Sequence, residues 1–111
     1  MAYDQDLANR IRELLAEQQG VSEKRMFGGL AFLIGGNMAV AASGQGGILL
    51  RVDPEESESL AAKPHASVAV MRGRPMAGWL RVAPEGLNTK RQLEPWIRRA
   101  VAYVRSLPAK G

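Results

Sequence analysis

Basic side chains in the second half of the sequence have the type and spacing to bind an anion. Residues 1–60 carry five basic and nine acidic side chains, whereas residues 61–111 carry ten basic and two acidic ones. The second half therefore has a net charge of +8, which suits contact with phosphate groups. A solvated face that keeps the protein in solution explains the same charges, and both readings stay open. The candidate anion or nucleic-acid contacts are Arg72, Arg74, Arg81, Lys90, Arg91, Arg98 and Arg105.

Catalytic and metal chemistry find little support in the sequence. The chain has no cysteine and a single histidine, His65. These counts exclude a thiolate nucleophile, a cysteine-rich zinc site and a two-histidine metal site. His65 lies in Ala-Lys-Pro-His-Ala, and we interpret it as an exposed loop residue. The carboxylates of residues 53–58 fit a helix N-terminus without a metal. We predict no catalytic residue, no metal, no cofactor and no enzymatic activity.

Two short patterns invite comparison with ligand-binding motifs. Ser43-Gly44-Gln45-Gly46-Gly47 is rich in glycine, but it lies between two predicted strands and lacks the spacing of a phosphate-binding loop, so it predicts a flexible turn. Arg72-Gly73-Arg74-Pro75 matches the core of a motif that places arginines in the minor groove of DNA. Apolar strand sequence on both sides instead predicts the tip of a hairpin, from which the arginines could still contact phosphate.

The strands that would position these residues begin with the apolar stretch Met26–Val40. It comprises an apolar run of nine residues, a glycine-asparagine turn and the start of a second run of five that ends at Ala42, which is typical of a hairpin. We expect Gly28 and Gly29 to permit a bulge or a close backbone approach. Ile48–Val52 extends the hairpin to a three-stranded meander. Ser67–Met71 and Trp79–Val82 form a second hairpin, which gives about five strands.

Three helices are predicted around this sheet. The first begins at Asp4 and ends at Gly20, which we expect to be its left-handed C-terminal glycine. A short middle helix begins at Asp53-Pro54 and ends before Pro64. A long last helix spans Asn88–Leu107, with a kink or a loose first turn at Pro95. The fold class is therefore α+β, an antiparallel sheet packed by helices.

Length and composition set the remaining expectations. A chain of 111 residues predicts one domain, residues 1–107, followed by a loose tail at residues 108–111. No stretch is apolar enough for a membrane span, so we expect no membrane partner. The N-terminus, Met-Ala-Tyr-Asp, is acidic and reads as the start of a helix. We therefore expect no signal peptide, and together with the absence of cysteine this predicts a cytoplasmic protein.

Four motifs occur in a characteristic order. They are Met26-Phe27-Gly28-Gly29, Leu50-Arg51-Val52-Asp53, Gly73-Arg74-Pro75-Met76 and Leu93-Glu94-Pro95-Trp96-Ile97-Arg98-Arg99-Ala100. With them, nearly the whole chain resembles the N-terminal domain of the TfoX/Sxy family. The resemblance implies an antiparallel α+β domain of bacterial regulators of natural competence, which act with a transcription factor of the cAMP-receptor type. Those regulators carry a second, helical domain, and we expect this chain to be a stand-alone version without it.

The functional prediction follows from the basic half and the resemblance together. We predict a non-enzymatic regulatory binding module that contacts DNA or a transcription complex through a basic surface. The alternative is a protein-interaction or homodimerisation module that uses a sheet edge or the surface around Met71, Met76 and Trp79. An enzyme of unknown reaction is the third possibility.

Overall fold

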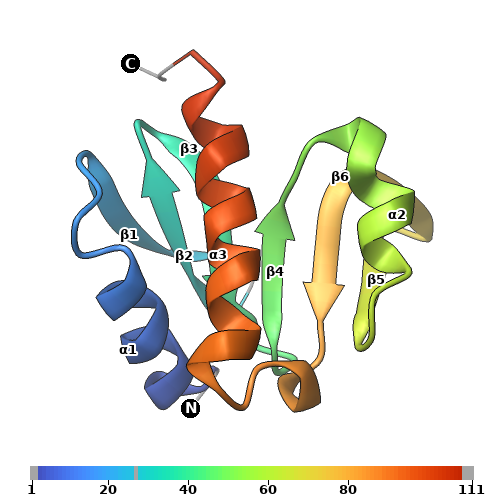
Figure 1. Cartoon of the computed structure of the whole chain (residues 1–111), viewed down its shortest axis with the longest axis horizontal. Helices are drawn as coiled ribbons and strands as arrows, with labels where there is room; N and C mark the ends of the chain where they lie inside the picture. The colour runs from blue at the N-terminus through green and yellow to red at the C-terminus, as the bar shows by residue number, and fades with distance from the viewer. Residues whose placement is uncertain (1–2, 27, 109–111) are drawn as a thin grey trace.

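A computed structural model describes residues 3–26 and 28–108, which form one sheet and the helices packed on it (Figure 1). The helices are α1 (Gln5–Leu14), α2 (Ser57–Ala61) and α3 (Lys90–Arg105), with short 3-10 helices η1 (Pro54–Glu56) and η2 (Pro84–Gly86). The strands are β1 (Val21–Met26), β2 (Gly29–Ile34), β3 (Asn37–Ala42), β4 (Ile48–Arg51), β5 (Ala66–Met71) and β6 (Arg74–Val82). Their order in the sheet is β1-β2-β3-β4-β6-β5, and each neighbouring pair is antiparallel.

The predicted α+β class is confirmed, but the sheet has six strands rather than about five. The additional strand is β1, which pairs with β2 from Val21 opposite Ile34 to Met26 opposite Gly29. Its four central residues are exposed and polar or charged, because β1 is an edge strand. Such a strand shows no alternation of apolar and polar residues, which is the pattern that identifies a strand in sequence.

The core lies between one face of the sheet and the helices α1 and α3 (Figure 1). Phe32, Val40, Leu50 and Leu80 are successive cross-strand neighbours on β2, β3, β4 and β6, and all four are fully buried. The helix α3 covers them with its own buried stripe, Leu93, Trp96, Ile97, Ala100 and Val104. Burial of one large apolar side chain stabilises a fold by about 1.5–3 kcal/mol, so this layer is the main source of stability.

The first helix begins as predicted and ends earlier. The Asp4 carboxylate caps α1 by accepting a 3.1 Å hydrogen bond from the backbone N–H of Leu7. The helix ends at Leu14, so the predicted end at Gly20 is wrong. Gly20 does adopt a left-handed φ of +73°, but it leads into β1, where its carbonyl accepts a 3.1 Å bond from Gly35 N–H. A left-handed glycine thus serves a turn beside the sheet.

The last helix is closed at its start by a capping box. The Thr89 hydroxyl accepts a hydrogen bond from Gln92 N–H, and the Gln92 side chain accepts one from Thr89 N–H. The helix therefore begins at Lys90, two residues after the predicted start, and continues to Arg105. Pro95 is its sixth residue and lies within the continuous helix. Because proline has no N–H, the Arg91 carbonyl four residues earlier lacks its helical hydrogen bond.

A buried side chain joins the sheet to the last described residue of the chain. Asn37, at the start of β3, donates a 2.9 Å hydrogen bond from Nδ2 to the carbonyl of Pro108. Pro108 belongs to the predicted loose tail, and its carbonyl is held by this bond; residues 109–111 lie outside the described part of the chain. Among the described residues, no helix combines the length and apolar character needed to cross a membrane.

Candidate functional site

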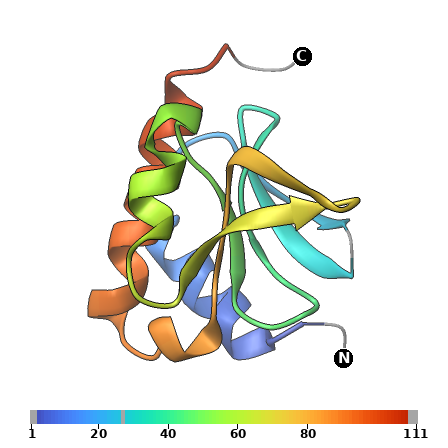
Figure 2. The ribbon, with the colours of Figure 1, turned by 90° about the vertical axis from the view of Figure 1, so that its right-hand side faces the viewer.

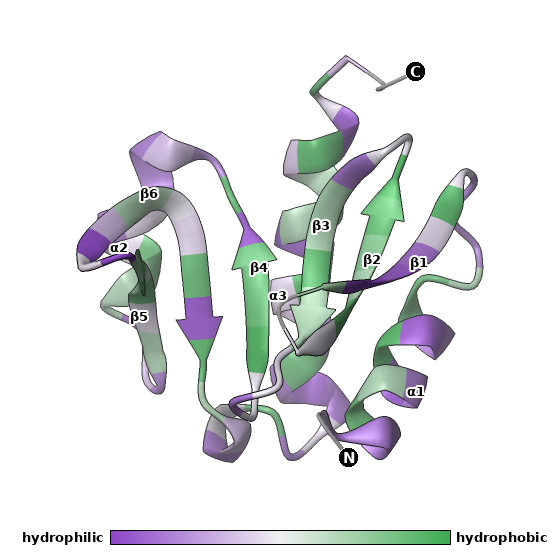
Figure 3. Cartoon of the chain, turned by 180° about the vertical axis from the view of Figure 1, so that it is seen from behind, coloured by the Kyte–Doolittle hydropathy of each residue, from purple (hydrophilic) through white to green (hydrophobic). Residues whose placement is uncertain are grey.

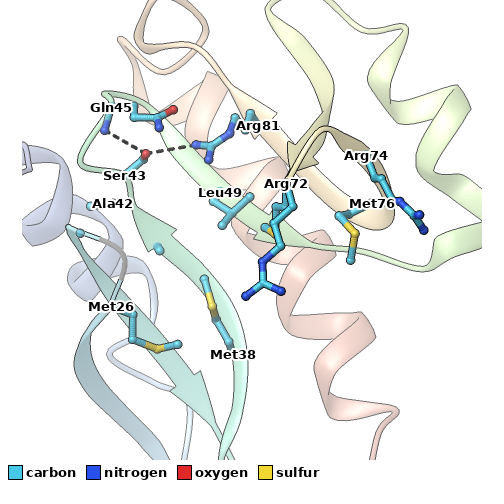
Figure 4. Close-up of a pocket in the computed structure, with 13 residues that line it drawn as sticks. Met26, Met38, Ala42, Ser43, Gln45, Leu49, Arg72, Arg74, Met76 and Arg81 are labelled. Atoms are coloured by element: carbon cyan, nitrogen blue, oxygen red, sulfur yellow. Dashed lines mark hydrogen bonds between the residues drawn. The ribbon is translucent and has the colours of Figure 1, made fainter.

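The sheet face opposite α1 and α3 (Figure 3) carries a groove of about 800 Å³ (Figure 4). Its floor lies on β3, β4 and β6. The end of the β1–β2 hairpin and the Met38 end of β3 form one wall, and the outer half of the β5–β6 hairpin forms the other. The described lining residues are Met26, Gly29, Met38, Ala41, Ala42, Ser43, Gln45, Leu49, Met71, Arg72, Arg74, Met76 and Arg81. Four methionines and three arginines therefore face one concave surface, and these side chains define the candidate site.

The floor consists of a cross-strand row and small residues beside it. Ala41 on β3 pairs with Leu49 on β4, and Leu49 pairs with Arg81 on β6. Gly29 must be glycine, since a Cβ there would lie 2.2 Å from the carbonyl oxygen of Ala42. The predicted close backbone approach at Gly29 is thus confirmed. Of the two alternatives expected for these glycines, the bulge does not occur at Gly28, which lies with a φ of +76° in the turn between β1 and β2.

One wall depends on an irregularity in β3. Phe32 pairs with Val40, but the next residue of β2, Leu33, pairs with Met38, so Ala39 is an extra residue in β3. In a regular strand Met38 would share the core face with Val40. The bulge instead allows Val40 to enter the core and Met38 to line the groove (Figure 4).

The other wall is the outer half of the β5–β6 hairpin, which turns away from the helices (Figure 2). Between the pairs Val68–Leu80 and Val70–Pro75, β5 advances by two residues and β6 by five, so β6 holds three extra residues. At this bend Gly78 has a φ of +89°. Its N–H donates a 2.6 Å bond to the buried Ser57 hydroxyl, and its carbonyl accepts a 2.8 Å bond from Val52 N–H. These bonds fix the direction of the hairpin.

The hairpin tip brings positive charge to the groove. Arg72 has a left-handed φ of +53° and Gly73 one of +77°, which confirms the predicted tip. Arg72 and Arg74 are exposed and line the groove from this tip, while Arg81 rises from the floor. The Arg81 guanidinium donates a 3.2 Å bond from Nη1 to the Ser43 hydroxyl. No aspartate or glutamate occurs among the described lining residues, so the groove is positively charged.

The four other predicted contacts, Lys90, Arg91, Arg98 and Arg105, belong to α3, which packs on the opposite face of the sheet (Figures 1 and 3). Arg98 pairs with Glu94 at 3.2 Å, and Arg105 donates to the Gln18 side chain at 2.8 and 3.0 Å and to the Gln19 carbonyl at 3.0 Å. Arg91 is exposed, and Lys90 lines a small depression beside Glu13. The seven candidates therefore form two sets on opposite faces.

His65 and the acidic residues after β4 take part in hydrogen bonds that shape the local backbone. His65 is exposed in the loop between α2 and β5 with a φ of +67°, and its carbonyl accepts a 2.9 Å bond from Ala83 N–H. The Asp53 carboxylate caps η1 through a 2.9 Å bond from Glu55 N–H. Across the described residues, no three histidine, aspartate or glutamate side chains come together as a metal site would require.

The ion pair between Arg12 and Glu23 produces the clearest pKa shift, and it lies away from the groove. The Arg12 guanidinium donates bonds of 2.6 and 2.8 Å to the two carboxylate oxygens of Glu23. These hydrogen bonds hold the pKa of the Glu23 carboxyl below its ordinary value, and the same contact raises the pKa of Arg12. The pair joins α1 to β1.

The groove is suited to binding rather than to acid–base chemistry. Arginine is the only ionisable residue type among its described lining residues, and arginine stays protonated in proteins. Methionine side chains are flexible and polarizable, so they can pack against apolar groups of different shape. The site therefore offers an adaptable apolar surface with fixed positive charges beside it.

Sequence reasoning found part of this site. It identified Arg72, Arg74 and Arg81 as anion contacts, and it named Met71 and Met76 as part of an interaction surface. Met26 and Met38 were missed, because both lie in apolar runs that read as core. The signal that could have identified them is the concentration of methionine in the strands, with four of the five methionines of the chain lining the groove.

The sequence model of the family described as TfoX N-terminal domain matches residues 13–104, which is most of the 111-residue chain. The match spans β1–β6, α2, most of α3 and thus all the described groove residues. A search of curated proteins and a search of solved structures each gave no match.

Proposed function

The chain belongs to the TfoX N-terminal domain family, a competence-related regulatory family, and from this premise we propose that it docks a protein of a transcription complex in the groove. The observation that carries the proposal is that four methionines and three arginines line one groove of about 800 Å³. Adaptable methionine surfaces are typical of proteins that bind protein segments. In this proposal the chain acts by binding and catalyses no reaction.

A protein suits the groove better than nucleic acid does. Nucleic-acid interfaces are polar and strongly basic, whereas most of this surface consists of methionine, leucine and alanine. Its three arginines could neutralise three phosphates at most, while the cations of α3 lie on the opposite face of the sheet. One duplex that lies in the groove would therefore leave the other basic set unused.

Site-specific photo-crosslinking in cells that express the chain tests this function. A photoreactive amino acid replaces Met38 or Met76 in the groove, and a matched probe replaces Glu58 on the exposed side of α2. We expect both groove probes to crosslink to one protein of the transcription apparatus and the Glu58 probe not to do so. Crosslinks only to unrelated proteins, or equal crosslinking from Glu58, would overturn the proposal.

Contact with the DNA backbone is a second candidate function, and it uses α3. Arg91, Arg98 and Arg105 follow one another at intervals of seven residues, which places them along one stripe of the helix at spacings of about 10 Å. This stripe could contact phosphates on the side away from the groove. The Glu94 and Gln18 side chains already engage two of the three arginines, so we rank this candidate second.

Fluorescence anisotropy with a labelled DNA duplex tests the α3 candidate. Binding should weaken as the salt concentration rises, since phosphate contacts release counterions. The Arg91→Glu/Arg98→Glu double variant should lose binding, whereas Arg72→Glu/Arg74→Glu should retain most of it. Absence of binding at low salt, or equal losses in the two double variants, would exclude the stripe as a DNA contact.

A further inference from the structure

We propose that the occupant of the groove is an amphipathic helix of a partner protein, with an apolar face and acidic flanks. This inference rests on the proposed docking function and adds the chemistry of the partner. It joins three observations, namely the pairing of the floor strands, the width of the groove and the sign of its charge.

The backbone of the floor favours a helix over an extended segment. β3 is paired with β2 and β4, β4 with β3 and β6, and β6 with β4 and β5, so the hydrogen-bonding edges of the three floor strands are occupied. An extended segment could not add to the sheet here, and its own N–H and C=O groups would face methionine, alanine and leucine side chains. Such unpaired polar groups are costly to bury, whereas a helix satisfies them internally.

The dimensions of the groove also fit a helix. Its described lining residues span the sheet from β2 to β6, which is three interstrand steps, and at about 4.8 Å per step the width is roughly 14 Å. A helix with its side chains is about 10–12 Å across. The volume of about 800 Å³ corresponds to roughly one and a half turns of a whole helix. One apolar face of two to three turns would fill the site.

The charge of the groove selects an acidic partner. Arg72 and Arg74 lie on one wall and Arg81 rises from the floor, without a carboxylate among the described lining residues. Acidic side chains on the flanks of a docked helix would reach these guanidinium groups and form charge-assisted hydrogen bonds. A second copy of this chain placed face to face would instead bring two sets of arginines together, which is repulsive.

A binding experiment with designed helices tests the inference on the full chain. The probe is a stapled, fluorescein-labelled peptide of about three turns, with leucine at i, i+3, i+4 and i+7 and glutamate elsewhere. Two control peptides have the same length, one with lysine in place of glutamate and one with the leucines at alternate positions. Anisotropy gives the affinities, and methyl signals of ¹³C-labelled methionine locate the peptide at Met26, Met38, Met71 and Met76.

We expect the acidic helix to bind and to shift the signals of the four groove methionines, and the two control peptides to bind at least tenfold more weakly. Arg72→Glu/Arg74→Glu should weaken the acidic helix about tenfold and strengthen the lysine helix, since reversing both charges restores complementarity. Both substitutions lie in an exposed hairpin tip, so the variant should fold. Arg91→Glu on α3 is the matched control and should change neither affinity.

Equal binding of all three peptides, or binding that leaves the methionine signals unchanged, would overturn the inference. Its failure can be told from a failure of the proposed function by mapping the crosslinked partner segment. A crosslink to a transcription protein at a basic or strand-forming segment would leave the function standing and exclude the acidic helix. A crosslink between two copies of the chain would identify a homodimer and exclude both.

Discussion

The guanidinium of Arg81 donates a 3.2 Å hydrogen bond to the hydroxyl of Ser43, and this bond crosses the groove from β6 to the turn after β3. The same hydroxyl accepts a 3.1 Å bond from Gln45 N–H. Ser43 thus shapes the turn and orients the floor arginine at once. Figure 4 shows both bonds at one end of the groove.

Ser43→Ala should lower the free energy of unfolding by about 1 kcal/mol, because two hydrogen bonds lose their acceptor. Urea denaturation followed by circular dichroism measures the change. Ser22→Ala on the exposed edge strand β1 is the matched control and should have little effect. Ser43→Ala combined with Arg81→Ala should cost less than the sum of the single changes. Strict additivity would show that the two side chains do not support each other.

Gly29→Ala should destabilise the domain by about 3 kcal/mol, because the added Cβ would lie 2.2 Å from the Ala42 carbonyl and force β2 and β3 apart. Gly73→Ala provides the comparison. Its φ of +77° strains an alanine, but no atom lies within 4 Å of the new Cβ, so the cost should be about 1 kcal/mol. Thermal and urea unfolding of the two variants give the values. A larger loss in Gly73→Ala would contradict the steric account.

Arg51→Lys should destabilise the domain by about 1 kcal/mol despite keeping the charge. The Arg51 guanidinium lies 5.4 Å from the ring centre of Trp79 and 5.8 Å from that of Tyr103, so it joins β4 to β6 and α3. Lysine has no planar group to stack on these rings. Chemical denaturation of Arg51→Lys beside Arg25→Lys, at an exposed position of β1, tests the contact. Similar stabilities of the two variants would argue against a contribution from stacking.

Glu23→Gln should remove a pH-dependent part of the stability. Since hydrogen bonds from Arg12 lower the pKa of Glu23 in the folded state, the carboxylate stabilises the fold above its ordinary pKa of about 4.3. That contribution is lost as the pH falls through the lower folded-state pKa. Arg12 stays charged throughout.

Melting temperatures between neutral and strongly acidic pH provide the measurement. The native chain should be more stable than Glu23→Gln at neutral pH, and the difference should shrink on acidification. Glu17→Gln, in the exposed turn after α1, should track the native chain at every pH. A difference that stays constant with pH would refute the linkage.

The elements that sequence predicted well are those with a strong periodic pattern or a cap. Asp4 and Asp53 each begin a helix through a side-chain hydrogen bond, and the apolar strands β2, β3 and β4 stand out by their composition. The edge strand β1 was missed, because its polar residues face solvent and, among the described strands, it pairs with β2 alone. Gly20 misled the prediction of α1, since a left-handed glycine serves a turn as well as a helix end.

The candidate site was only half predictable because it depends on irregular backbone. A bulge at Ala39 directs Met38 to the groove, and the bend at Gly78 brings Arg72 to the opposite wall. Neither feature follows from alternation along a strand. The second half of the sequence is strongly basic, but the sheet separates its basic side chains. Arg81 lies on one face, and the basic side chains of α3 lie on the other.

The pairing of β4 with β6 has a dynamic consequence. Within the described sheet, it is the pairing that joins the first four strands to the β5–β6 hairpin, and the groove lies directly over it. Local opening of the β4–β6 pairing would widen the groove and expose backbone amides of both strands to hydrogen exchange. An occupant that contacts both Leu49 and Arg72 would stabilise the β4–β6 pairing. Docking should therefore slow amide hydrogen exchange along β6.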